Sequence, residues 1–198
     1  FSRCRMLRSF VVPNKVNRIG INAFSDCTTL TSIVIPESVK SIGDYAFSHC
    51  SALKKINLGA SVESIGEKAF HNCESLTDIS LSSSLTSIGK YAFFGCKSLK
   101  EIVIPDSVTS MGVSAFCDCL ALEKVTLGNS LKKITENMFK NCQSLHTVVI
   151  SPSVTNIDWQ AFINCVNLTE IIIPDTVQVI SNCAFIGCTN LKSVVLSN

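Results

Sequence analysis

Apolar residues recur along this chain at a fixed step of 23 residues, and the consensus unit reads A-F-x-x-C-x-x-L-x-x-I-x-I-P-x-S-V-x-x-I-G-x-x. The phenylalanine slot is filled in every unit, by Phe1, Phe24, Phe47, Phe70, Phe93, Phe116, Phe139, Phe162 and Phe185. A leucine six positions later is equally regular, from Leu7 to Leu191. Self-similarity at a period of about 20 to 50 residues is typical of a solenoid, in which each unit forms one turn.

The segment L-x-x-I-x-I predicts a strand, because its last two aliphatic residues are two apart and share one face of an extended chain. Ile33 and Ile35 form one such pair. We expect the strands of successive units, eight in all, to pair in parallel in one continuous sheet. Proline, glycine or serine follows most of these strands and predicts a turn. Residues 39–43 (V-x-x-I-G) predict a short extended return on the far side, and A-F-x-x-C predicts a short helical turn.

A single unit is too small to bury its own apolar side chains, whereas stacked units form a continuous core. We therefore expect one domain over residues 1–198, built from about eight repeats, with the phenylalanine, cysteine and leucine slots all buried. Because the chain opens at Phe1 in the middle of a unit, we interpret it as a piece of a longer protein. Neither end carries a polar capping segment, so we expect end-to-end self-association or frayed termini.

A longer period of three units is also visible. The segment CSALKKINLGASV, from Cys50, is similar to CLALEKVTLGNSL, from Cys119, which lies 69 residues later. Pro36, Pro105 and Pro174 keep the same step. We infer that a block of three units was duplicated.

The cysteine content alone suggests a disulfide framework, whereas the cysteine positions indicate one slot that is refilled in each unit. Nine of the eleven cysteines fill one slot, at Cys4, Cys27, Cys50, Cys73, Cys96, Cys119, Cys142, Cys165 and Cys188. We expect these thiols to point inward and to donate weakly to turn carbonyls. Neighbouring slots lie within disulfide distance, but parallel Cβ vectors oppose a bridge, so we favour free thiols. Cys117 and Cys183 lie off this slot, and we expect both to be exposed and reactive.

Composition and charge exclude several classes of protein. Hydrophobic residues make up 46% of the chain and charged residues 16%, which excludes a disordered chain. The net charge of +2 gives no reason to expect a nucleic-acid partner. No apolar run approaches the roughly 18 to 20 residues that span a bilayer, so we expect no membrane insertion.

Residues with catalytic or metal-binding chemistry do not converge in the sequence. Motifs for phosphate loops, dinucleotide sites, serine hydrolases and zinc proteases are missing. His49 and His71 fall near the same turn of adjacent units, where a metal site with Cys117 is conceivable. We favour surface variation at unconstrained slots. We expect no enzyme activity and no cofactor, because catalysis needs a convergent, non-repeating group of residues.

The outward face of the predicted sheet is the candidate binding face. Its residues are Val34, Lys55, Asn57, Asp78, Glu101, Val103, Lys124, Thr126, Val149, Glu170 and Ile172. Solenoids commonly bind partners on their sheet, which favours a protein-binding strip here. The alternative is β-propensity, because Val, Ile and Thr suit any exposed strand. Phe94 and Trp159 stand at slots held elsewhere by polar or small residues, where each either marks a contact patch or folds back on a neighbouring turn.

The strings IPESVKSIGDYAFSHCSALKKI and IPDSVTSMGVSAFCDCLALEKV resemble the BspA-type leucine-rich repeat, also called the Treponema pallidum type. The resemblance covers nearly the whole chain. It implies a leucine-rich-repeat solenoid, a β-rich, curved, right-handed coil with one parallel sheet. Thr135, Asp158 and Ser181 depart from the pattern by replacing the glycine, and we expect a less regular far face there.

The resemblance also bears on function. It implies a protein-binding or adhesion module of a surface or secreted protein of bacteria or protists, with host, matrix or microbial proteins as partners. The alternative is an intracellular scaffold, because nine reduced, buried cysteines fit a reducing compartment slightly better.

Overall fold

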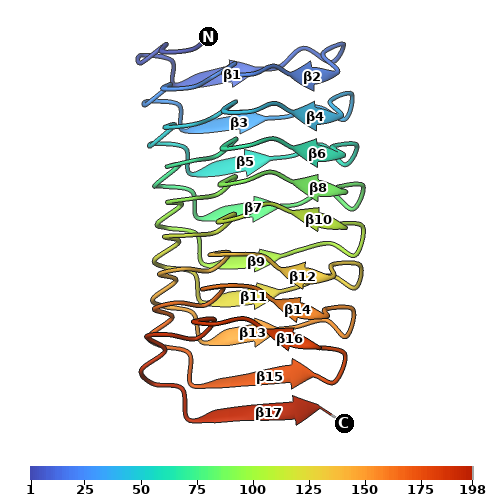
Figure 1. The fold of residues 1–198 in the computed structure, drawn as a ribbon. Coiled ribbons are helices and arrows are strands. Elements are labelled where there is room, and N and C mark those ends of the chain that lie inside the picture. Colours follow the sequence, from blue (N-terminus) through green and yellow to red (C-terminus); the bar gives the residue numbers. More distant parts are fainter. Residues whose placement is uncertain (198) are drawn as a thin grey trace.

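Each 23-residue unit forms one turn of a coil in the computed structural model, which describes residues 1–197. The turns stack in chain order, so that the two termini lie at opposite ends of the stack (Figure 1). Each strand pairs in parallel with at least one strand a single unit away, as Ile33 does with Ile56. The predicted fold, a leucine-rich-repeat solenoid built on parallel strands, is confirmed.

The strands form two rows, one on each side of the coil. The first row contains β1 (Ser9–Val11), β3 (Ser32–Val34), β5 (Lys55–Asn57), β7 (Asp78–Ser80), β9 (Glu101–Val103), β11 (Lys124–Thr126), β13 (Thr147–Val149), β15 (Glu170–Pro174) and β17 (Ser193–Ser197). The second row contains β2 (Arg18–Ile19), β4 (Ser41–Ile42), β6 (Ser64–Ile65), β8 (Ser87–Ile88), β10 (Ser110–Met111), β12 (Lys133–Ile134), β14 (Asn156–Ile157) and β16 (Val179–Ile180). The second row is the predicted far-side return.

Hydrogen bonding divides both rows, so the single continuous sheet expected from the sequence is not formed. The first row comprises β1-β3-β5-β7, β9-β11-β13 and β15-β17. Its breaks follow the two turns that place Ser82 and Ser151 after the strand. The second row breaks once, between β10 and β12, where Thr135 takes the place of Gly112. Asp158 and Ser181 also replace this glycine, yet β12, β14 and β16 stay paired, so the loss of the glycine does not by itself explain the break.

The A-F-x-x-C segment forms hydrogen-bonded turns, and residues 1–197 contain no helix. The expectation of helical turns was wrong because each unit places two residues in the left-handed region, such as Tyr45 (φ 57°) and His49 (φ 60°). The backbone N–H groups between them alternate their partners. The Ser48 N–H donates within its own unit to Tyr45, whereas the Phe47 N–H donates across units to Ala69. This alternation fastens each turn to the next.

The core is a set of continuous stacks along the coil axis. Successive phenylalanine rings lie 5.1–5.8 Å apart from Phe1 to Phe185. The predicted burial of the phenylalanine, cysteine and leucine slots is confirmed for the internal turns. At the first turn Phe1 is 60% exposed and Cys4 is also exposed, because no described turn packs over them. End-to-end association stays a prediction.

Candidate binding face

The first row of strands carries all the residues of the candidate binding face. They form two columns, which we name by their position in the strand. The first column contains Ser32, Lys55, Asp78, Glu101, Lys124, Thr147, Glu170 and Ser193. The second column contains Val11, Val34, Asn57, Ser80, Val103, Thr126, Val149, Ile172 and Val195. Their buried neighbours, such as Ile102 between Glu101 and Val103, point inward, so both columns face away from the core as the alternation predicted.

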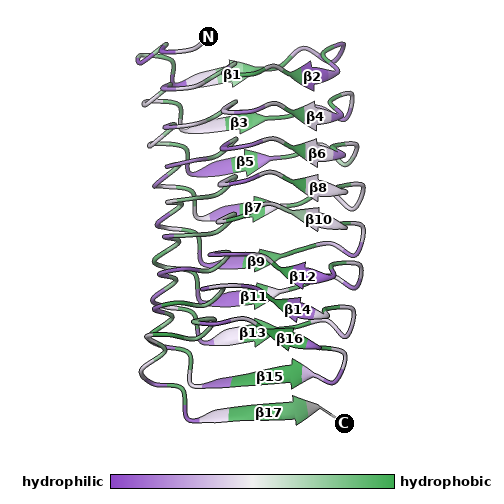
Figure 2. Ribbon diagram, viewed as in Figure 1, coloured by the Kyte–Doolittle hydropathy of each residue, from purple (hydrophilic) through white to green (hydrophobic). Residues whose placement is uncertain are grey.

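Apolar side chains of the second column are unusually open to water. Val34 and Val103 are each 62% exposed, and Ile172 is 49% exposed. Thr126 is half-buried, whereas the other candidate residues are exposed. Figure 2 shows β9, β15 and β17 changing from more hydrophilic at their first residue to hydrophobic beyond it. The two columns therefore place a strip rich in exposed apolar side chains, interrupted by Asn57, Ser80 and Thr126, beside a polar one.

Charges of the first column are not neutralised within the described chain. Lys55 is in register with Asp78, and Lys124 with Glu101. Nevertheless, no ion pair within 4.0 Å joins any of these side chains among residues 1–197. Their charges remain in water, where a partner can approach them.

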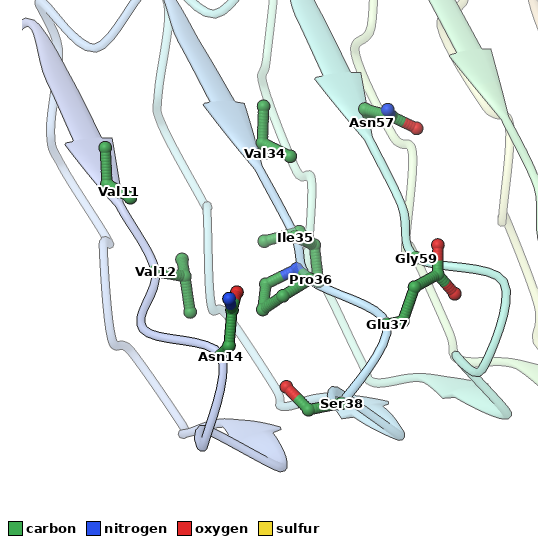
Figure 3. A pocket seen from close by; sticks show the side chains of 10 residues that line it. All are labelled: Val11, Val12, Asn14, Val34, Ile35, Pro36, Glu37, Ser38, Asn57 and Gly59. Atoms are coloured by element: carbon green, nitrogen blue, oxygen red, sulfur yellow. The ribbon is translucent and has the colours of Figure 1, made fainter.

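A shallow hollow of about 520 Å³ lies where the first strands end, beside the second column (Figure 3). Val11, Val34 and Asn57 follow one another on three successive strands above it, and Pro36 lies between them and the turn. The Glu37 carboxylate accepts a hydrogen bond from the Ala60 N–H (2.6 Å). Sequence reasoning missed Pro36 and Glu37 as part of this face, although the 69-residue step of the prolines was a signal.

A cluster of rings lies at the turns, away from the two columns. His71 stacks on Phe94 (5.0 Å between centroids) and lies 5.2 Å from His49, so the expected proximity of the two histidines is confirmed. Tyr91 packs against Phe94, which therefore folds onto its neighbours. Trp159 is 44% exposed.

The environment of His71 disfavours its charged form. Burial, followed by the charges of His49 and Lys68, lowers the pKa of His71 to about 4. Its Nδ1 atom is buried without a hydrogen-bond partner. Within residues 1–197 no group of three or more His, Cys, Asp or Glu side chains is arranged to hold a metal ion.

The slot cysteines act as small donors in the core. From Cys27 to Cys188, each Sγ donates to the carbonyl of the phenylalanine 26 residues earlier, at 3.1–3.3 Å. This confirms the expected bond to a turn carbonyl. All eleven cysteines are free thiols. Burial raises the pKa of Cys50 to about 12.

The prediction for Cys117 was wrong. Its side chain is only 5% exposed, and burial, with the neighbouring Asp118 charge, raises its pKa to about 12. It is therefore not a reactive thiol. Its slot, directly after the core phenylalanine, lies at the inner edge of the turn. Cys183 is half-buried.

Residues 1–197 contain no helix with the length and apolar character that crossing a bilayer requires. In comparisons with known proteins, no curated sequence matches the chain. Solved structures do match it. A Treponema pallidum leucine-rich repeat protein has 28% identity and a TM-score of 0.76, and the match covers 94% of this chain and 78% of that one.

Two further structures share the fold. A Bacteroides ovatus leucine-rich repeat protein has 28% identity and a TM-score of 0.65, with 96% of this chain and 63% of that chain covered. A Eubacterium ventriosum leucine-rich repeat protein has 22% identity and a TM-score of 0.63, with 93% and 65% covered, and shows the fold alone.

A family model, described as the BspA type leucine rich repeat region (6 copies), matches residues 1–122 and 63–192. These matches together span almost the whole chain. They agree with the resemblance read from the repeated motifs and with the coil of parallel turns. The chain is a protein-interaction repeat module, and it belongs to the BspA-type leucine-rich repeat family.

Proposed function

We propose that this chain is the adhesion or recognition module of a cell-surface or secreted protein, and that it binds a host, matrix or microbial protein through the two strand columns. We also propose that the chain forms a single domain without catalytic activity. Residues of the face contribute in different ways. Val34, Val103 and Ile172 supply apolar contact, while Lys55 and Glu101 supply charges that select the partner.

The observation that carries this proposal is the row of exposed apolar side chains on one face of the strands. Polar residues such as Ser80 interrupt this row, but Val103, Val149 and Ile172 still leave large apolar side chains open to water on one face, as binding surfaces do. The flanking charges support the same reading, because unpaired surface charges favour encounter with a complementary protein. β-Propensity accounts for valine at single positions, but it does not account for the charges beside it.

The experiment measures binding to a panel of immobilised extracellular-matrix proteins by surface plasmon resonance. The double variant Val103→Lys with Val149→Lys puts two charges into the apolar strip. Both side chains are exposed, so the fold is retained. We expect binding to weaken at least tenfold, because buried charges in an interface lose their hydration without a counterion.

The matched control is Ser110→Lys with Val179→Lys. It adds the same two charges at exposed, outward positions of β10 and β16 in the second row. We expect this control to bind as the unchanged protein does. If both double variants weaken binding equally, or if only changes at Phe94 or Trp159 abolish it, the strand columns are not the binding face.

A further inference from the structure

We propose, building on the proposed function, that the binding face consists of like subsites repeated every three turns. Each subsite takes one apolar side chain and, two residues later on the same face, a lysine or arginine from an extended segment of the partner protein. The segment lies along the coil axis. The subsites centre on Val34, Val103 and Ile172.

Equivalent residues line hollows beside the second column at two places 69 residues apart, and around Val103 they are shared between two hollows. Val34, Pro36 and Gly59 line the first hollow, and Val103, Pro105 and Gly128 line hollows at the positions 69 residues later. Nine of the ten residues that line the first hollow have equivalents at this step in the two hollows around Val103. Ile172, Pro174 and Asp175 repeat the apolar, proline and acidic positions once more, with Ser197 in place of the glycine.

The proline turn packs closely on the turn that follows it, and this arrangement recurs with the 69-residue step of the sequence. A Cβ on Gly59 would lie 2.6 Å from the Pro36 carbonyl oxygen, and one on Gly128 would lie 2.3 Å from that of Pro105. Glycine is therefore the residue that fits after the proline turn. Its lack of a side chain leaves space beside the proline ring. The third turn of each block carries Ser82 or Ser151 instead.

Each hollow combines an apolar wall with a carboxylate. Glu37 uses Oε2 to accept the Ala60 N–H, and Asp106 uses Oδ1 to accept the Asn129 N–H (2.8 Å). In the described residues the second oxygen of each carboxylate has no hydrogen-bond donor, and neither residue forms an ion pair. A cation next to an apolar group complements this arrangement.

The spacing of the subsites selects an extended partner. Three turns at the usual strand separation place successive subsites roughly 14 Å apart. Four residues of an extended chain span about 13 Å, and residues four apart lie on the same face of a strand. A helix covers this distance in about nine to ten residues, which point to different faces of the helix. An extended segment therefore presents matching side chains, whereas a helix does not.

The probes are synthetic peptides measured by isothermal titration calorimetry. One peptide carries two Leu-x-Lys pairs with the leucines four residues apart, in a Ser/Thr background, so that both leucines and both lysines lie on one face of the extended chain. The others carry the two pairs with the leucines three apart, a single pair, or two Leu-x-Glu pairs. We expect the four-residue peptide to bind at least tenfold more tightly than each of the others, because two subsites act together.

Single variants test the order of the subsites. Val103→Ser removes the middle subsite, so that no two neighbouring subsites remain, and we expect it to reduce affinity to that of the single-pair peptide. Val34→Ser is the matched control at the same exposed fraction (62%). It leaves the Val103 and Ile172 subsites adjacent, so we expect a loss of only about twofold. Asp106→Asn keeps the acceptor for the Asn129 N–H, and we expect a twofold to fivefold loss.

The outcomes separate this inference from the proposed function. Equal effects of Val34→Ser and Val103→Ser, or equal affinity for the three- and four-residue spacings, would overturn the repeated subsites. If the peptides fail to bind while Val103→Lys with Val149→Lys still weakens binding to a matrix protein, the inference falls and the proposed function stands. If the peptides bind as expected and no matrix protein binds, the partner class is wrong and the subsites stand.

Discussion

The inner and outer faces of the first-row strands differ in how strictly they repeat one type of residue. On the inner face, Ile102 is 2% exposed and its neighbours in register are Ile or Val in almost every turn. On the outer face, Val103 is 62% exposed, and the neighbouring turns carry Ser80 and Thr126. Inside, each turn meets the same packing contact, so one type of residue fits. Outside, water replaces that contact, so different types of residue can occupy the position.

The strongest test of this contrast is the phenylalanine stack. Phe93 is fully buried, with ring centroids 5.2 Å and 5.1 Å from Phe70 and Phe116. We expect Phe93→Ala to lower the free energy of unfolding by about 3 to 5 kcal/mol, because it removes stacking and leaves a cavity. Val103→Ala should cost less than about 1 kcal/mol. Urea unfolding measures both, and equal losses would show that the stack is not the core.

The close approach of neighbouring turns gives the next largest effect. Gly128→Ala would place a Cβ 2.3 Å from the Pro105 carbonyl oxygen, so we expect a loss of about 1 to 3 kcal/mol. Gly20 has no atom within 4 Å of its Cβ position, and Gly20→Ala should change stability by less than about 1 kcal/mol. Thermal unfolding of the two variants compares them directly. If Gly128→Ala leaves the thermal stability unchanged, neighbouring turns can move apart at little cost in free energy.

The ring cluster at the turns gives the smallest effect, and it depends on pH. The pKa of His71 is lowered from 6.5 to about 4, so the folded state holds the neutral ring. The neutral His71 ring contributes to the free energy of unfolding above pH 6.5, and this contribution is lost as the pH falls toward 4. We expect a loss of about 1 to 2 kcal/mol over this range, less than the full pKa shift implies, because water reaches the ring.

His71→Phe removes the titrating group while keeping a ring that can stack on Phe94. This variant should lose less stability between pH 6.5 and pH 4 than the unchanged protein loses. The same pH profile for His71→Phe as for the unchanged protein would exclude His71 as its source.

Much of the fold could be predicted from the sequence because burial repeats with the period of the chain. Phe47, Cys50 and Leu53 occupy slots that every turn must fill, so their spacing alone indicated which residues form the core. The alternation around Ile102 likewise predicted that Val103 faces outward. The location of the candidate face was predicted from the same alternation, although its role in binding stays a prediction.

Tertiary structure decided what depends on contacts between particular neighbouring turns. Cys117 is buried, the A-F-x-x-C turns contain left-handed residues, and hydrogen bonding breaks after Ser82. The hollow beside Pro36 was likewise decided by contacts between turns, because the glycine of the following turn packs closely on Pro36 there. A periodic sequence specifies the average turn. Differences of a few tenths of an ångström in the contacts between one turn and the next determine where the stack departs from that average.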